Sequence, residues 1–483
     1  MPAILYFATA AAILRIVHGT TTTLSRRAAI VLLLLPLLLT GRALVTGGVY
    51  GPIDLAYDEE PLASLARDHG ITSVGNPMLT DVQRLMIPWR AAVRYAFAHG
   101  EWPLWNPFTF SGDILAAASE PSPWHPFHLL GQLLPLAQSI TFEATLVFFA
   151  AALAAFLFAR DLGASEDASF VAAAGWMLSQ FILFFGQVPL GAAVLMQPLV
   201  FVSVRRIAER PDWRSIARLA IVLALVVVAG HPESTLHVVT LGIAWGVFEM
   251  VRLRSWSRAA RVAGAATLAG ILALLLSSIH LLPFLEALPQ TADYELRVTK
   301  FANERRWVDA LEAAVRLLRA IVPFVFGSPA TETAAVPARY YDPAFPYAGS
   351  IVIAAAAAGW LGWRDRARWF LAGLAVFGFL AGVSAPGISH LLARLPLFEI
   401  ALNERFIFSA VLAVVTLAAF GVDRMASGRW SAVPLAVTVA IAGTVAALWP
   451  WMLSRGLTTT HLHQNAVREI VPLALASAVF LIG

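Results

Sequence analysis

The chain contains no cysteine among its 483 residues. That absence excludes disulfides, thiolate catalysis and cysteine-ligated metals, and it leaves the redox compartment undetermined. Charged residues are also scarce: they make up 13% of the sequence, against 59% for hydrophobic residues. An ordinary soluble domain carries about 25% charged residues, and the mean hydropathy of this chain is +0.73. The composition therefore predicts a membrane protein.

Several signatures of soluble enzymes are missing as well. Exposed segments contain no glycine-rich phosphate loop, no HExxH zinc motif and no serine–histidine–aspartate signature. The net charge of +4 would suggest a nucleic-acid partner in a soluble protein. Here, however, the arginines lie mostly in short loops between apolar runs, where they orient helices. We therefore expect no nucleic-acid partner.

What the sequence does contain is a series of apolar runs, each close to the length of about 20 residues that crosses a bilayer. They predict spans near residues 28–46, 138–159, 168–185, 187–204, 216–231, 234–251, 262–281, 348–363, 369–385, 405–423, 431–452 and 468–483. The opening run is short and lacks a positive n-region, so we expect an extra N-terminal helix there rather than a cleaved signal peptide. The last run stops at Gly483 inside an apolar segment, which predicts that a C-terminal region is missing.

These runs predict an all-α polytopic membrane protein with about 11–13 transmembrane helices. The chain has no fixed-period repeat and no low-complexity linker that would divide it into separately folding halves. We therefore expect a single transmembrane domain over residues 1–483.

The short connections between spans carry clustered arginines, which the positive-inside rule assigns to the cytoplasmic side. These clusters lie at residues 26–27, 205–218, 252–261, 364–368 and 424–429. Two long loops, at about residues 47–137 and 282–347, then face the exported side. We expect a multi-pass protein of the cell (inner or cytoplasmic) membrane whose polar chemistry is gathered on its outer face.

The first outer loop begins with an amphipathic segment, residues 82–97, whose apolar side chains recur at helical spacing. Its other face carries Gln83, Arg84, Arg90 and Arg94. This pattern is typical of a helix in the membrane interface, and Pro88 is expected to kink it or to divide it into two short helices. Asp81 precedes the segment. Its carboxylate could cap the helix by accepting backbone N–H bonds, or it could have a functional role.

The rest of this loop is rich in aromatic residues and prolines, in "GEWPLWNPFTFSG" (100–112) and "EPSPWHPFHLL" (120–130). Two interpretations are open. Trp102 and Trp105 could belong to an interfacial aromatic belt, or they could form a platform on which sugar rings stack. A belt alone does not explain the polar residues that accompany them, which are Asn106, Asp113, Glu120 and His125.

Two further outer-face positions carry ionisable groups. His231 and Glu233 interrupt an apolar run in "AGHPESTLH" (229–237), either as a helix corner capped by Glu233 or as a pair that faces a wet cleft. Arg405 lies in "LNERFIF" (402–408), where an outer loop enters the bilayer. Its guanidinium suits an anionic headgroup or a pyrophosphate, although ordinary phospholipid anchoring explains it equally well.

Weaker signals come from two other stretches. Residues 303–327 predict an amphipathic helix whose Arg305 and Arg306 could bind phosphate or form a solvated charge run. The "HLH" at 461–463 lacks a nearby third ligand, so we interpret it as a loop.

Taken in order, these motifs resemble those of the YfhO-like bacterial membrane proteins, which belong to the C-type (GT-C) glycosyltransferase superfamily. The resemblance covers roughly residues 28–425. The stretches that carry it are "TDVQRLMIPWR", "GEWPLWNPFTFSGDILAAASEPSPWHPFHLL", "GHPE", "VPFVFG…YAG" and "ERFIFSAVLAVVTLAAFGVD". It implies a GT-C-like bundle of about a dozen transmembrane helices, with interfacial helices in the first outer loop and an active site between that loop and the membrane.

The resemblance also implies an activity: transfer of a sugar from a polyprenyl-phosphate donor to a cell-envelope glycan or lipid acceptor on the exported face, usually with inversion. Asp81 matches the acid that such enzymes carry after the first span, which favours a general base. Arg405, with Arg84 or His231, would stabilise the leaving phosphate of the donor. Sugar or acceptor contacts would come from Trp102, Trp105, Asn106, Glu120, His125 and Glu233.

The chain departs from the family pattern where "EPSPWHP" (120–126) replaces a polar amide and a Tyr-Pro step. That departure leaves the acceptor and the metal preference open. No cofactor is firmly expected, but Asp81, Asp113 and Glu120 could converge on a divalent cation. Two other classes of function stay open: a transporter or flippase of lipid-linked sugars, and a non-catalytic cell-envelope assembly protein.

Overall fold

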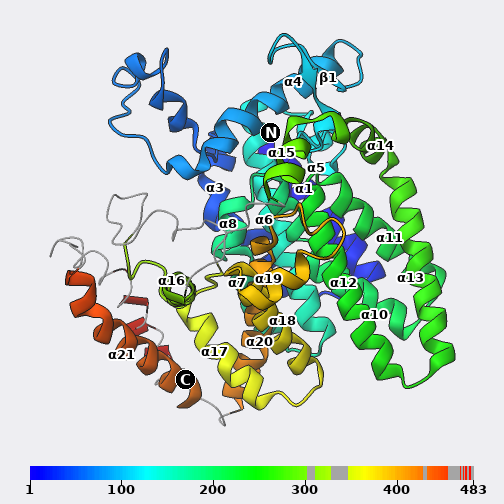
Figure 1. Ribbon diagram of the computed structural model, residues 1–483, viewed down its shortest axis with the longest axis vertical. Helices are drawn as coiled ribbons and strands as arrows, with labels where there is room; N and C mark the ends of the chain where they lie inside the picture. Colours follow the sequence, from blue (N-terminus) through cyan, green and yellow to red (C-terminus); the bar gives the residue numbers. More distant parts are fainter. Residues whose placement is uncertain are drawn as a thin grey trace. The chain divides into compact units, whose positions relative to one another are not determined.

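The computed structural model describes residues 1–301, 310–327, 346–427 and 432–454, together with a few positions after residue 467. The regular structure in this part of the chain is helical apart from one pair of two-residue strands (Figure 1). Strand β1 (Trp105–Asn106) pairs with β2 (Asp113–Ile114) in antiparallel orientation. The predicted all-α class is therefore confirmed.

Seven helical segments among the described residues are long and apolar enough to cross a membrane. They are Pro2–Thr20, Leu136–Asp161, Pro189–Glu209, Pro232–Leu253, Trp256–Leu276, Asn403–Ala426 and Ala432–Pro450. Two bent helix pairs raise the number to nine if each pair counts as one span. A multi-pass membrane protein is thus confirmed, whereas the expected 11–13 transmembrane helices stay a prediction.

The first bent pair explains why one predicted span is not a straight helix. Residues 28–46 form α2 (Arg26–Leu34) and α3 (Leu37–Thr46), which meet at an angle of 67°. Pro36 lies at the break, where its missing N–H and its ring interrupt the helical hydrogen bonds. The second pair, α18 (Ala367–Gly382) and α19 (Pro386–Leu392), bends by 88°.

Several predicted spans form shorter helices than expected. The run at 168–185 divides into α7 (Glu166–Met177) and α8 (Gln180–Phe185). Helices α11 (Trp213–Val228) and α17 (Ser350–Gly362) are apolar but shorter than a typical crossing. More than half of the final predicted span, 468–483, lies outside the described residues.

The chain forms two compact units, and each is discontinuous in sequence. Unit 1 comprises residues 1–157 and 184–296, and unit 2 comprises residues 158–183 and 297–483. The expectation of a single domain stays a prediction.

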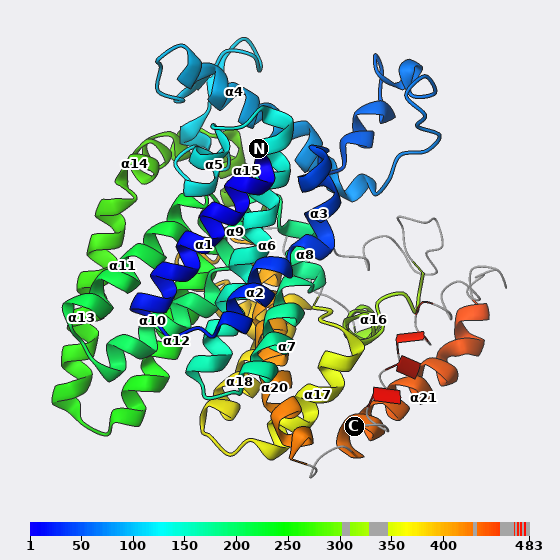
Figure 2. The ribbon, with the colours of Figure 1, turned by 180° about the vertical axis from the view of Figure 1, so that it is seen from behind.

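Unit 1 contains the first outer loop and most of the predicted site residues. Its longer helices are α1 (Pro2–Thr20), α4 (Ile87–Ala98), α6 (Leu136–Asp161), α10 (Gln197–Glu209), α11, α12 (Pro232–Leu253), α13 (Trp256–Leu276) and α14 (Ser278–Ala287). Helices α10 and α12 lie side by side (Figure 2), and Gly242 faces Val200 at their contact. The indole N–H of Trp245 donates to the carbonyl of Phe201, 3.1 Å away. A small residue at such a contact allows close approach of two membrane helices.

Unit 2 is built around α20 (Ile407–Ala426), which packs against α7, α17 and α18. Its described part also contains α16 (Ala310–Ile321) and α21 (Ala432–Ser454). Trp363 stacks on Phe420 with ring centroids 3.7 Å apart. The apolar, fully buried face of α20 makes it the core helix of this unit.

Candidate functional site

The amphipathic segment of the first outer loop forms two helices, as the position of Pro88 led us to expect. A π-helix, η4 (Val82–Met86), runs directly into α4. Pro88 lies in the first turn of α4, where its missing N–H interrupts the helical hydrogen bonds at the change from the π-helix to the α-helix. Val82, Met86 and Val93 are buried on the apolar face. The predicted interfacial position of the segment stays a prediction.

Asp81 occupies the N-cap position of η4, but its side chain accepts no capping hydrogen bond. The helix-cap interpretation of Asp81 is therefore wrong. The residue is exposed, and within the described residues its carboxylate makes no hydrogen bond or ion pair. It is thus available to an external group.

Arg90 lies on the polar face of the segment and is nevertheless only 7% exposed. Its Nε donates to Oε2 of Glu143 at 3.1 Å, and its Nη1 donates to the carbonyl of Pro121 at 2.6 Å. Its Nη2 lies 2.5 Å from Nε2 of His128. Because α4, α5 (Pro126–Gly131) and α6 supply these groups together with the intervening loop, the guanidinium joins four segments of unit 1.

Burial controls the protonation of this network. Burial lowers the pKa of His128 well below its ordinary value, and the adjacent Arg90 charge lowers it further, so the ring is neutral. Its Nδ1 lies 2.8 Å from the carbonyl of Ser122 and donates to it, which leaves Nε2 to accept from Arg90. Burial also lowers the pKa of Arg90, and Glu143 opposes that shift. The buried charge of Arg90 is thus matched by the Glu143 carboxylate, as a stable buried ion pair requires.

Arg94 anchors the same helix one turn later. Its Nη1 donates to the carbonyl of Leu134 at 2.7 Å, and its Nη2 donates to the carbonyl of Gly131 at 2.6 Å. Arg90 and Arg94 thus lie on the face opposite the apolar one, as the periodicity predicts, but they contact protein groups there. Both arginines hold α4 on the helices that follow it in the chain.

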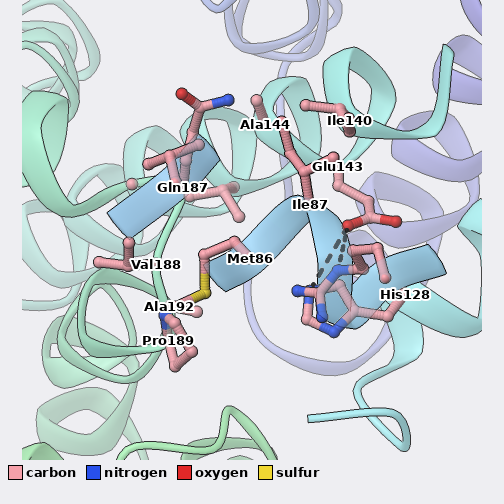
Figure 3. Close-up of a pocket in the computed structure, with 14 residues that line it drawn as sticks. Met86, Ile87, His128, Ile140, Glu143, Ala144, Gln187, Val188, Pro189 and Ala192 are labelled. Atoms are coloured by element: carbon pink, nitrogen blue, oxygen red, sulfur yellow. Dashed lines mark hydrogen bonds and ion pairs between the residues drawn. The ribbon is translucent and has the colours of Figure 1, made fainter. Parts of the chain in front are cut away.

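A small pocket lies against this network (Figure 3). Its walls include Val82 and Met86 from η4, with Arg90, Glu143 and Gln187. Its volume is about 40 Å³, which suits a few water molecules and is too small for a sugar ring. The pocket is therefore part of the support behind the segment that begins with Asp81, rather than a substrate site.

The aromatic loop presents Trp102 and Trp105 to the outside, with exposures of 63% and 56%. The ring of Trp105 lies against the backbone of Gly112, where a Cβ would approach within 2.4 Å of the indole. Gly112 also has a φ of +121°, a conformation that side chains disfavour. Gly112 therefore allows the indole of Trp105 to pack against the hairpin backbone, while the predicted contact of Trp105 with a sugar stays a prediction.

Asn106 was predicted to contact sugar or acceptor, and the structure shows a local use for its amide. Its Oδ1 accepts from the backbone N–H of Phe108, and its Nδ2 donates to Thr109. The residue is buried. These contacts shape the hairpin, while the contact with a ligand stays a prediction. Asp113 is exposed, and its Oδ1 accepts from the N–H of Ile114.

His231 and Glu120 are brought together. The Nε2 of His231 lies 4.0 Å from Oε1 of Glu120. The Nδ1 of His231 accepts the N–H of Ser234 and thereby caps α12, so the N-cap residue of this helix is His231. Glu233 lies in the first turn, where its negative charge favours the helix N-terminus.

His125, like His231, is the N-cap residue of a helix and accepts a backbone N–H with its ring. Its Nδ1 accepts from the N–H of Phe127 at the start of α5, and its ring centroid lies 5.0 Å from that of His128. Burial lowers the pKa of His125 to about 3. The imidazole is thus neutral at physiological pH and cannot supply positive charge to a phosphate.

Arg84 and Arg405 are the two arginines predicted to bind phosphate, and they belong to different units of the chain. Arg84 forms an exposed ion pair with Glu59, so its charge is already matched. Arg405 lies in the short helix η10 (Asn403–Phe406) of unit 2, whereas Asp81 belongs to unit 1. Their meeting in one pocket stays a prediction. Positions 305–306 and 461–463 lie outside the described residues.

Sequence reasoning missed the residues at the centre of this site: Arg90, Ser119, His128, Glu143 and His280. The Ser119 hydroxyl lies 3.0 Å from Nε2 of His280 and donates to the carbonyl of Gly230. One signal was available for Glu143, since an acid inside a predicted span is by default a functional candidate.

In the described part of the chain, no three metal-ligating side chains are arranged to bind a metal.

No protein-family model matches the chain, and no curated protein matches it. The similarity to YfhO-like proteins consequently stays an expectation from the motifs. The function has to be argued from the residues themselves.

Proposed function

We propose that the chain is a membrane glycosyltransferase that moves a sugar from a polyprenyl-phosphate donor to a cell-envelope glycan or lipid acceptor on the exported face. The observation that carries the proposal is the state of Asp81: an exposed carboxylate without a partner among the described residues, at the start of a helix that buried arginines hold in place. An acid in this state suits a general base.

In the proposed reaction, Asp81 takes the proton of an acceptor hydroxyl. The hydroxyl oxygen forms a bond to the anomeric carbon of the donor sugar. The bond from that carbon to the phosphate oxygen breaks, and its electron pair leaves on the polyprenyl phosphate. A positioned general base typically contributes about 10²- to 10⁴-fold to the rate.

Such a base must be held accurately, because a small misplacement of a catalytic group costs much of its effect. The Arg90–Glu143 pair and the two carbonyl contacts of Arg94 supply rigid support to α4. Asp81 belongs to the same continuous helical segment. The proposal therefore places the base on a fixed helix rather than on a loose loop.

A second cavity in unit 1 supports a lipid-linked donor. It has a volume of about 280 Å³ and almost entirely apolar walls. Its lining includes Ile13 of α1, Phe149 and Leu153 of α6, Leu199 of α10 and Leu225 of α11. It shares Val147 and Ala192 with the small pocket beside the Arg90–Glu143 pair, so the apolar cavity adjoins a pocket that contains charged groups. An amphiphilic ligand with a hydrocarbon chain is compatible with this pairing.

The test replaces Asp81 by Asn in protein purified into nanodiscs and measures sugar transfer from a panel of polyprenyl-phosphate hexoses to a cell-envelope extract. We expect D81N to lose at least about 10²-fold in turnover and to keep the thermal stability of the wild type, because Asp81 makes no cap bond. Glu101→Gln, at an exposed acid of the same loop, is the matched control and should stay active. A folded D81N protein that transfers sugar at the wild-type rate, or wild-type protein inactive with every donor, would refute the proposal.

A further inference from the structure

A separate surface pocket lies on the first long loop, and its lining includes Gln83 and Arg84, which follow Asp81 by two and three residues. It has a volume of about 250 Å³, close to the lower end of the range of about 300–1,000 Å³ for small-molecule sites. Its lining consists of Leu55, Ala56, Glu59, Glu60, Pro61, Leu62, Gln83 and Arg84. We refer to it as the Glu60 pocket.

The Glu60 pocket and the proposed base belong to one helical segment. Gln83 and Arg84 follow Asp81 by two and three residues on this continuous segment, which is less than one turn of a helix. A ligand in this pocket would therefore lie within about one helical turn of the backbone of Asp81.

The chemistry of the lining suits a polyol. Glu60 can accept hydrogen bonds from hydroxyl groups, and the Gln83 amide can both donate and accept. The remaining wall includes apolar groups of Leu55 and Pro61, against which the C–H face of a sugar ring can lie. A pyranose has this combination of a hydroxyl rim and apolar faces.

The charge of the lining disfavours a phosphate. Glu59 and Glu60 contribute two carboxylates, and the single guanidinium in the lining, that of Arg84, is already paired with Glu59. An anionic ligand would meet net negative charge there, which raises its energy. A neutral ring meets no such penalty.

We propose that the Glu60 pocket binds a neutral sugar ring of the acceptor glycan and presents its hydroxyl to Asp81. This inference rests on the proposed transfer reaction and assigns the acceptor side of it. Arg84 then holds Glu59 in the wall of the pocket, instead of binding the phosphate of the donor.

The experiment measures binding of glucose, galactose, N-acetylglucosamine and their disaccharides to the full chain in nanodiscs, with inorganic phosphate as the anionic probe. The test variants are Glu60→Ala and Gln83→Ala, and the matched control is Glu101→Gln, an exposed acid of the same loop outside the pocket. We expect at least one sugar to bind, each test variant to raise its Kd by about tenfold, and phosphate not to compete. In transfer assays the test variants should raise KM for the acceptor and leave KM for the lipid donor unchanged.

The outcomes separate this inference from the proposed function. Asp81→Asn should abolish transfer while it keeps sugar binding. Binding without transfer by the wild-type protein would refute the glycosyltransferase proposal and keep the pocket assignment. The absence of sugar binding, binding that both test variants leave unchanged, or a raised donor KM would overturn the pocket assignment.

Discussion

At the residue scale, the guanidinium of Arg90 is the centre of the candidate site. It is buried, and each of its three nitrogen atoms has a partner: Glu143, the carbonyl of Pro121, and His128. A buried charge that loses its partner is costly because the remaining group stays out of water without compensation. Arg84, by contrast, pairs with Glu59 in solvent, where ion pairs contribute little.

We expect the two arginines to differ in their effect on stability. Arg90→Ala should lower the free energy of unfolding by about 3–5 kcal/mol, because Glu143 is left buried and unpaired. Arg84→Ala should lower it by about 0–1 kcal/mol, because its ion pair is exposed. Thermal unfolding of both variants in the same detergent, followed by tryptophan fluorescence, measures the difference. Equal effects of the two substitutions would show that the Arg90–Glu143 pair does not hold α4.

At the element scale, the contact between α17 and α20 depends on two glycines. A Cβ at Gly359 would lie 1.9 Å from the carbonyl oxygen of Leu417, and a Cβ at Gly421 would lie 1.9 Å from that of Ala355. The clashing atoms belong to backbone, so no side chain can rotate away to make room. Small residues of this kind permit the close helix contacts on which membrane bundles depend.

We therefore expect Gly359→Ala and Gly421→Ala each to destabilise the protein by about 1–3 kcal/mol, the usual cost of overpacking. The control is Gly373→Ala on α18, where a Cβ would meet nothing within 4 Å and where alanine is the better helix former. Thermal unfolding in detergent compares the three variants. If Gly373→Ala loses as much stability as the other two, close packing of α17 on α20 is not the cause.

At the scale of the whole molecule, the absence of cysteine makes the membrane orientation directly measurable. Single-cysteine variants carry no background thiol, so Ser73→Cys in the first long loop and Ser257→Cys at the start of α13 can be labelled separately. Both serines are exposed. The sequence around Ser257 contains several arginines, Arg254, Arg258 and Arg261 among them, and the positive-inside rule predicts that this serine lies on the cytoplasmic side.

We expect a membrane-impermeant maleimide to label Ser73→Cys in intact cells and Ser257→Cys only after permeabilisation. Labelling is read by a gel shift with a thiol-reactive polymer. The reverse pattern would invert the topology and move Asp81 to the cytoplasmic side, where nucleotide sugars are available. The need for a lipid-linked donor would then disappear.

Sequence reasoning was most successful where one physical property decides the outcome. The helical, multi-pass character follows from the composition and from the length of the apolar runs. A segment of this length in a bilayer must form its backbone hydrogen bonds internally, and a helix does so. The division of the 82–97 segment at Pro88 follows from the missing N–H of proline. The position of Asp81 just before this segment was also readable, but its lack of a capping bond was not.

The chain by itself therefore determined the class of the protein, the places of its apolar helices and the amphipathic character of the segment after Asp81. Only the tertiary structure decided that Arg90 is buried, that its partners are His128 and Glu143, and that Arg84 belongs to a pocket with Glu59. Helical periodicity tells which face of a helix a side chain occupies. It does not tell which distant segment lies against that face, and a buried charge is stable only when that segment supplies its partner.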